Sequence, residues 1–262
     1  AWQLLALSLP LFLPNQYSVL WLLRKQLDRW SVRSCEAGQF ATFCQRALER
    51  SLENGPRLTR LSRMETMSLL TRKPYQHSKP HSIPVHLPNE TYQLVGFDGS
   101  STVSECLEML CCATGLTSSL DGGWMLYHDD AQIQSLDHRI DTKLKLCDVI
   151  HDWESKLLEN KSGKFPSNRV IRLSLQKRYF FRTHVKSETE RDKIFQCYQL
   201  SQAVRDGKFP TNSTLAVELC SILAQMHFGN CKDCAKDQVK CVIHKFYPTG
   251  HESGIGGSEQ LR

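Results

Sequence analysis

A proline-bounded stretch between residues 74 and 98 constrains this chain more than any other feature, because the period of its apolar residues changes there. Before the stretch, apolar residues recur at the three- to four-residue spacing that is typical of amphipathic helices. Within it, the segments 83–87 and 93–97 alternate apolar and polar residues, with the turn sequence 88–90 between them. Alternation around a turn predicts a β-hairpin with one buried face. Two architectures therefore meet at one short junction, and we expect a rigid tandem.

Four helices are predicted before the junction. Asn15 is the expected cap of the second helix, and Gly55 with Pro56 ends the third. Ser62 and Glu65 have capping-box spacing, which predicts the start of the fourth. The expected helices cover residues 1–13, 15–30, 35–54 and 62–71. Four helices joined by short loops make a partial helical bundle.

The pattern after the hairpin predicts a β-grasp. Thr102, with Glu105 three residues later, predicts a capped helix that ends at Gly115. Further strands are expected at 123–128, at 144–147 and, as a pair, over 170–185, with a short helix from Asp148. Strand, strand, helix and then more strands is the order of a ubiquitin-like fold.

Helical patterns return in the last third of the chain. Ser187 and Glu190 repeat the capping-box spacing, and the helix that they open is expected to end at Gly207. Two more helices are expected, from Ser213 to Gly229 and over 236–246. The predicted fold class is therefore α+β and multidomain.

The eleven cysteines lie mostly inside apolar patterns, which favours reduced, buried thiols over a disulfide scaffold. One group stands apart, because Cys231 and Cys234 are followed by Cys241 and His244 one helical turn apart. Three thiolates and an imidazole at these spacings would hold a tetrahedral zinc and make a zinc-stabilised regulatory domain. A structural zinc usually organises a domain that lacks its own core, and this domain has one. We therefore expect an exposed loop with incidental cysteines and no cofactor, and keep the zinc site as the alternative.

Catalysis and nucleic-acid binding find little support in the sequence. The adjacent acid and histidine pairs at 128–130, 137–138 and 151–152 point apart in strands or loops, and neither a GxSxG elbow nor an HExxH helix is present. The aromatic and basic run at 176–184 alternates as one face of a strand would. We expect a protein that is not an enzyme and does not bind nucleic acid.

The net charge of +6 is concentrated in the first third of the chain. Residues 1–81 hold 12 Lys and Arg against 5 Asp and Glu, whereas residues 82–185 hold 11 against 13. A basic first domain predicts an acidic partner surface, such as a filament or an acidic tail, although a solvated helix face would give the same count. The candidate partner-binding residues, here called the basic stripe, are Arg46, Arg50, Arg57, Arg60, Arg63, Arg72 and Lys73.

Several long stretches resemble a known domain tandem. The segments WQLLALSLPLFLP, FATFCQRALER, SRMETMSLLTRKPYQHSKPHSIPVHLPNETYQLVGFDGSSTV and KFPTNSTLAVELCSILAQ are similar to a myosin tail homology 4 domain followed by a FERM domain. The sequences of these segments are most similar to those of the pleckstrin-homology-domain-containing family H proteins, and more distantly to the tails of unconventional myosins. The resemblance implies that residues 1–80 are the C-terminal part of the myosin tail homology domain, 81–185 the ubiquitin-like first FERM lobe, and 186–262 an incomplete, acyl-CoA-binding-protein-like second lobe.

The resemblance also implies a function. In that family the tandem is a non-catalytic adaptor that links cytoskeletal filaments, receptor cytoplasmic tails and peripheral membrane. We therefore expect a cytoplasmic protein associated with the cytoskeleton or the plasma membrane. The apolar opening has no basic region or cleavage site and is interrupted by Pro10 and Pro14, so we expect no signal peptide. The chain begins and ends within helical patterns, so we expect a piece of a longer protein that lacks the first helices and the third FERM lobe.

Overall fold

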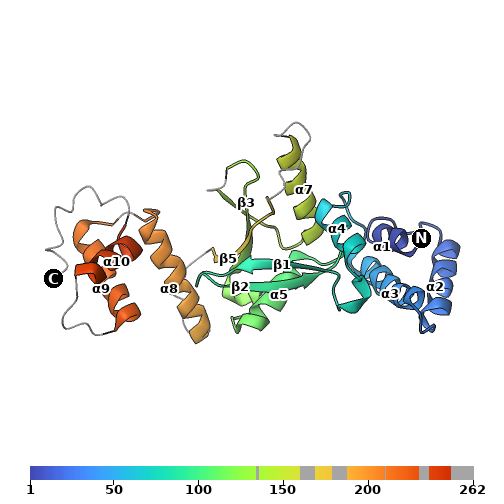
Figure 1. Cartoon of the computed structure of the whole chain (residues 1–262), viewed down its shortest axis with the longest axis horizontal. Coiled ribbons are helices and arrows are strands. Elements are labelled where there is room, and N and C mark those ends of the chain that lie inside the picture. The colour runs from blue at the N-terminus through green and yellow to red at the C-terminus, as the bar shows by residue number, and fades with distance from the viewer. Residues whose placement is uncertain (134–135, 160–168, 179–187, 210, 230–235, 249–262) are drawn as a thin grey trace. The chain divides into compact units, whose positions relative to one another are not determined.

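The computed structural model describes residues 1–133, 136–159, 169–178, 188–209, 211–229 and 236–248. The chain divides into two compact units, residues 1–191 and residues 192–262. The first unit contains a helical part and a mixed sheet, and the second is helical (Figure 1). The predicted boundary near residue 80 lies inside the first unit and stays a prediction.

Four helices and a 3-10 turn form the first part of this unit: α1 (Trp2–Ser8), α2 (Tyr17–Ser31), α3 (Glu36–Asn54), α4 (Arg63–Thr71) and η1 (Pro74–Gln76). Their shared core includes Ala6, Leu27, Cys44, Leu48 and Leu69. The capping box at the start of α4 is confirmed, because the Ser62 side chain accepts from the Glu65 N–H and the Glu65 carboxylate accepts from the Ser62 N–H. The predicted Asn15 cap is wrong: Gln16 is the extended residue before α2, and it makes no side-chain cap.

The sheet has the order β2-β1-β5-β3-β4. Its strands are β1 (His81–His86), β2 (Tyr92–Phe97), β3 (Trp124–Asp129), β4 (Asp137–Arg139) and β5 (Leu173–Lys177). The predicted hairpin is present, with β1 antiparallel to β2 and Ile83 opposite Val95. The first and last strands pair in parallel at the centre, where Val85 lies opposite Leu173. This is the arrangement expected of a β-grasp.

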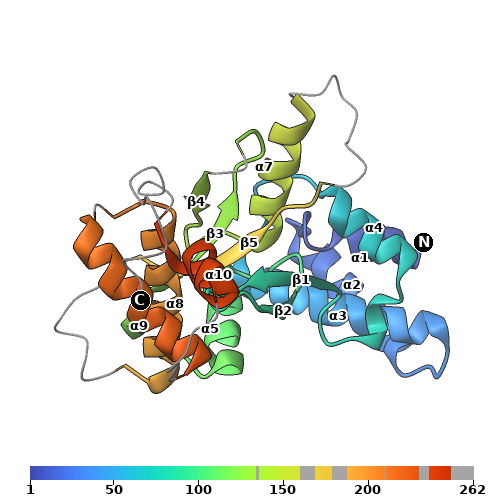
Figure 2. The ribbon, with the colours of Figure 1, turned by 60° about the vertical axis from the view of Figure 1, so that its left-hand side comes forward.

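Helices α5 (Val103–Thr114), α6 (Ser119–Gly122) and α7 (Leu146–Glu159) complete the sheet domain. The α5 helix contacts β2 and β3 through its buried stripe of Val103, Cys106, Leu107 and Leu110. The α7 helix lies beside α4 of the helical part, as the views in Figures 1 and 2 and the contacts agree. The sheet domain therefore meets the helical part along α4 and α7.

One strand prediction is wrong. Residues 144–147 are not a strand, because Lys145 forms only an isolated bridge with Thr102 and α7 begins at Leu146. A short apolar run has the same appearance in a buried strand and in a buried helix, so its periodicity does not separate them. Of the strand pair expected over 170–185, the structure has β5, and residues 179–185 lie outside the described residues. Strand β4 was missed, because its three residues are all polar.

The second unit contains most of α8 (Glu190–Arg205), α9 (Ser213–Phe228) and α10 (Lys236–Phe246). Asn212 caps α9, since its side-chain oxygen accepts from the Leu215 N–H at 2.7 Å. Among the described residues of this unit, Ala216, Cys220 and Tyr247 form a buried cluster, against which partly buried apolar side chains of α9 and α10 pack. Ser187, predicted to cap α8, lies outside the described residues.

Candidate functional site

The α3–α4 loop inserts a buried arginine between the helical part and the sheet domain. The side chain of Arg57 is 0% exposed. Its Nε donates to Asp148 Oδ1 of α7 at 2.8 Å, and its Nη1 donates to Glu65 Oε1 of α4. Burial alone would lower the pKa of Arg57, but Glu65 and Asp148 raise it. Arg57 therefore stays charged and joins α4 to α7.

Other polar groups surround this contact. Thr59 Oγ1 donates to Asp148 Oδ1 at 2.7 Å, and Lys145 Nζ donates to the backbone carbonyl of Pro56 at 3.0 Å. The Glu154 carboxylate of α7 accepts from the backbone N–H groups of Arg63 and Met64 at 2.6 and 3.2 Å. These N–H groups open α4 and have no partner inside the helix. The sheet domain thus caps a helix of the other domain.

A second polar contact joins α3 to the β2–α5 loop. Arg50 Nε donates to Asp98 Oδ2 at 3.2 Å, and its Nη2 donates to Glu105. Lys79 Nζ donates to Asp98 Oδ2 at 2.6 Å, and Asn54 Nδ2 donates to Glu105 Oε1 at 2.9 Å. Burial tends to raise the pKa of Asp98, but Lys79 and Arg50 lower it below its usual range. The carboxylate therefore stays ionised at neutral pH.

Thr102 caps α5 as predicted, by accepting from the Glu105 N–H at 3.2 Å. The Glu105 carboxylate, however, contacts Arg50 and Asn54 of α3. Gly99 allows the β2–α5 loop to approach the segment after α1 closely, because a Cβ at this position would lie 2.5 Å from the Cβ of Pro10. We use the name polar junction for this set of contacts. It comprises the bonds of Arg50 and Arg57 to their carboxylate partners, the bonds of Glu154 to the start of α4, and the bond of Lys79 to Asp98.

The structure divides the basic stripe into two groups. Arg57 is buried, and the side chain of Arg50 is 26% exposed between two carboxylates. These two side chains contact the sheet domain of the same chain. The other members of the basic stripe are exposed, and they are Arg46, Arg60, Arg63, Arg72 and Lys73. A role of these residues in partner binding stays a prediction.

A pocket of about 280 Å³ opens beside the polar junction. Its lining includes Arg46 and Arg50 of α3, Glu65 of α4, His81 of β1 and Asp98. It therefore has walls from both domains and mixes acidic and basic side chains.

The remaining candidate residues are scattered. Cys241 and His244 are exposed on α10, whereas Cys231 and Cys234 lie outside the described residues, so the zinc alternative stays a prediction.

In the sheet domain, His138 Nε2 and Asp130 Oδ2 are 2.7 Å apart, a pair from residues that are not adjacent in sequence. The backbone N–H groups of Ile133 and Gln132, with His138, lower the pKa of Asp130. That pairing holds a turn beside β4 at the edge of the sheet, and neither residue lines the pocket.

No helix within the described ranges is long and apolar enough to cross a membrane.

Comparison with known proteins identifies two domains. The MyTH4 domain family, whose name abbreviates myosin tail homology 4, matches residues 1–68, and the RA-like domain family matches residues 79–179. A Drosophila melanogaster protein, described as uncharacterized protein CG43867, is 41% identical over 267 residues, which cover 100% of this chain and 14% of the relative. The chain therefore spans a small part of that relative's length.

Solved structures share the fold. The MyTH4-FERM MF1 domain of Dictyostelium discoideum myosin VII has a TM-score of 0.75 at 16% identity, covering 97% of this chain and 50% of that chain. The C-terminal MyTH4-FERM domain of human myosin 7b, solved in complex with the harmonin-a PDZ3 domain, has a TM-score of 0.77 at 17% identity. It covers 99% of this chain and 50% of that chain. The predicted tandem is confirmed at the level of the fold.

Proposed function

We propose that this chain, which carries a MyTH4 domain followed by an RA-like domain, is a non-catalytic adaptor module that binds protein partners. It would link cytoskeletal filaments to receptor tails and peripheral membrane, in the cytoplasm at the cytoskeleton or plasma membrane. The observation that carries the proposal is the polar junction, in which Arg57 bonds to both Glu65 and Asp148. A junction of this kind would hold the two domains in one orientation, and preorganisation lowers the entropy cost of binding.

The exposed part of the basic stripe is the surface that we assign to the partner. Arg46, Arg60 and Arg72 are exposed on or beside α3 and α4. Exposed cations steer an acidic surface toward them, and each contact is weak and sensitive to salt. The partner that fits this chemistry is an acidic filament or an acidic protein tail. Arg50 and Arg57 are left out of this surface, because their carboxylate partners lie within the chain.

Co-sedimentation with microtubules at low and moderate salt tests the assignment. The variant reverses three exposed charges, with Arg46→Glu, Arg60→Glu and Arg72→Glu. We expect salt-sensitive pelleting of the wild-type chain and an apparent Kd raised by about tenfold or more in the variant. A matched control reverses Arg139, Lys143 and Arg172, which are exposed on the sheet domain and change the net charge equally.

The control separates a defined surface from general attraction. Equal weakening by both triple variants would mean that net charge alone governs binding. Absence of pelleting at low salt would make the basic stripe a solvated face, and direct the search to receptor tails and membrane. Circular dichroism of each variant verifies that the helix content is unchanged.

A further inference from the structure

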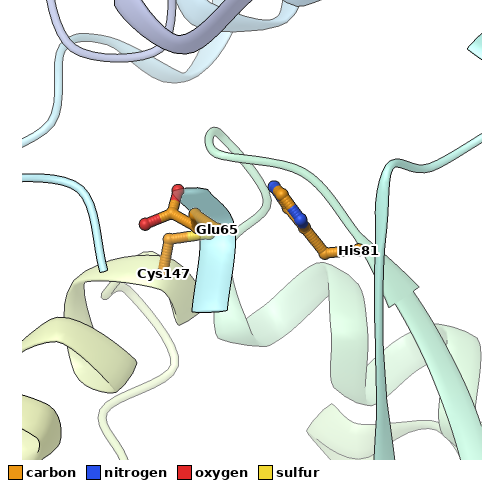
Figure 3. A group of neighbouring side chains, drawn as sticks. All are labelled: Glu65, His81 and Cys147. Atoms are coloured by element: carbon orange, nitrogen blue, oxygen red, sulfur yellow. The ribbon is translucent and has the colours of Figure 1, made fainter. Parts of the chain in front are cut away.

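Three side chains with metal-binding atoms meet at the polar junction. Glu65 comes from α4, His81 is the first residue of β1, and Cys147 is in the first turn of α7. One carboxylate oxygen, one imidazole nitrogen and the thiol sulfur all lie within 4.8 Å of one another. Figure 3 shows Glu65 and Cys147 side by side, with the His81 ring on the opposite side of the group. All three residues are buried.

His81 is the member of the group that has an unsatisfied buried atom. The residue is 3% exposed, and among the described residues its buried Nδ1 has no hydrogen-bond partner. A buried polar group without a partner is destabilising, and a bound water or ion is a common partner for such a group.

The other two side chains already have partners. Glu65 Oε1 accepts from Arg57, and Glu65 Oε2 accepts from the backbone N–H and hydroxyl of Ser62. The Cys147 thiol lies 3.5 Å from the backbone oxygen of Asp98. A carboxylate oxygen has two lone pairs, so Oε1 retains one beside its contact with Arg57. Hydrogen bonds of this kind also orient carboxylates that bind metals.

Acidic and basic groups both lie near these three side chains. Arg57 is shared by Glu65 and Asp148, so these three ionised groups together carry one net negative charge. Lys145 and Arg72 are further cations nearby, and the Lys145 Nζ contacts the backbone carbonyls of Gly55 and Pro56. Glu65 and His81 both line the junction pocket, which gives an ion a path from solvent.

We propose that Glu65, His81 and Cys147 bind a divalent cation of intermediate softness, with Zn²⁺ as the best fit to this donor set. A thiolate, an imidazole and a carboxylate are the ligands that zinc takes in proteins, at about 2.0–2.3 Å. Binding would form the metal–sulfur bond and release the Cys147 thiol proton to solvent, since the thiolate is the ligand. The pocket side offers room for water as a fourth ligand. The ion would tie the MyTH4 helix α4 to the first strand and the last helix of the RA-like domain.

Cobalt substitution of the 262-residue chain tests this site. The metal-free protein, prepared with a chelator and a thiol reductant, is titrated with Co²⁺, and thiolate-to-cobalt absorption and bound metal per chain are measured. We expect one Co²⁺ per chain with a thiolate band, displaced by Zn²⁺. Cys147→Ser should remove the band, and His81→Phe, which keeps a ring against Phe97, should weaken Co²⁺ binding by about tenfold or more.

Matched controls separate this site from the cysteine cluster near the C-terminus. Cys106→Ser changes a buried thiol of α5 outside the group, and Cys241→Ser disables the alternative cluster. Both should keep the band and the stoichiometry. A band that Cys241→Ser removes and Cys147→Ser preserves would overturn the proposal, and so would failure of the wild-type chain to take up Co²⁺.

Hydrogen exchange provides a second measurement that does not depend on the folding of a variant. With Zn²⁺ added to the wild-type chain, we expect slower exchange at α4, at the start of β1 and in the first turn of α7. Slowing confined to residues 229–248 would place the metal elsewhere and overturn the proposal.

Discussion

The polar junction of residues 1–191 and the helical unit of residues 192–262 bury different kinds of groups. At the polar junction, Arg57 and Glu65 are almost fully buried and form an ion pair. In the described part of the helical unit, the buried cluster of Ala216, Cys220 and Tyr247 is mainly apolar and contains no ion pair. Large apolar side chains of the same unit are exposed, among them Ile222 at 55% and Met226 at 67%.

This difference in buried groups suits the two regions to different roles. A buried ion pair costs desolvation energy and is repaid only in one geometry, so it favours a defined arrangement of two domains more than it adds stability. A small apolar cluster imposes less directional constraint, and exposed apolar side chains are available for contact with other surfaces. We therefore expect the polar junction to respond sharply to loss of one charge, and the helical unit to respond to loss of apolar volume.

Replacement of Arg57 by Ala should have the largest effect. It leaves Glu65 and Asp148 buried without their shared cation, which should cost about 3–5 kcal/mol in the free energy of unfolding. Urea unfolding followed by tryptophan fluorescence measures it, because all five tryptophans lie in the first 191 residues. Arg60→Ala, which changes an exposed neighbour, should shift the free energy by less than about 0.5 kcal/mol. A loss below about 1 kcal/mol for Arg57→Ala would show that the buried contacts of Arg57 with Glu65 and Asp148 contribute little to the stability of this unit.

Truncation of Tyr247 should act on the other region. Tyr247 is 2% exposed, and its replacement by Ala should destabilise the helical unit by about 3 kcal/mol. Hydrogen exchange should quicken in α9 and α10, while the tryptophan-detected transition of the first unit stays in place. The control is Met226→Ala, where the side chain is mostly exposed. Equal destabilisation of both units would mean that they unfold together, and the contrast between them would fail.

Removal of Arg50 should have the smallest effect. This side chain is 26% exposed, so solvent screens its bonds to Asp98 and Glu105. Arg50→Ala should cost about 1 kcal/mol in the same urea experiment, well below the effect at Arg57. Arg46→Ala, one turn earlier on α3 and exposed, is the matched control. A cost for Arg50→Ala equal to that of Arg57→Ala would show that burial does not set the difference.

Local sequence signals predicted the starts of α4 and α5, although the cap expected at Asn15 was wrong. Ser62 and Thr102 cap their helices as expected, because the bond from each side chain reaches only three residues along the chain. The residues 144–147 were predicted incorrectly, because Leu146 and Cys147 are buried in a helix as they would be in a strand. Strand β4 had no apolar signal to find.

The candidate sites were less predictable than the fold. The sequence located the excess of positive charge, but it assigned Arg50 and Arg57 to the same surface as Arg46. It gave no sign of Glu65, His81 and Cys147 as a group, because ligands so far apart in the chain have no recognisable spacing.

The sequence by itself determined the period of each segment, the helix caps at Ser62 and Thr102, and the basic character of the first domain. These depend on neighbours within a few residues. Only the tertiary structure decided which arginines face solvent, because Asp98 and Glu105 are 48 and 55 residues from Arg50, and Asp148 is 91 residues from Arg57. A charge count cannot reveal that pairing, since the partner of a cation is set by the folding of one domain against the next.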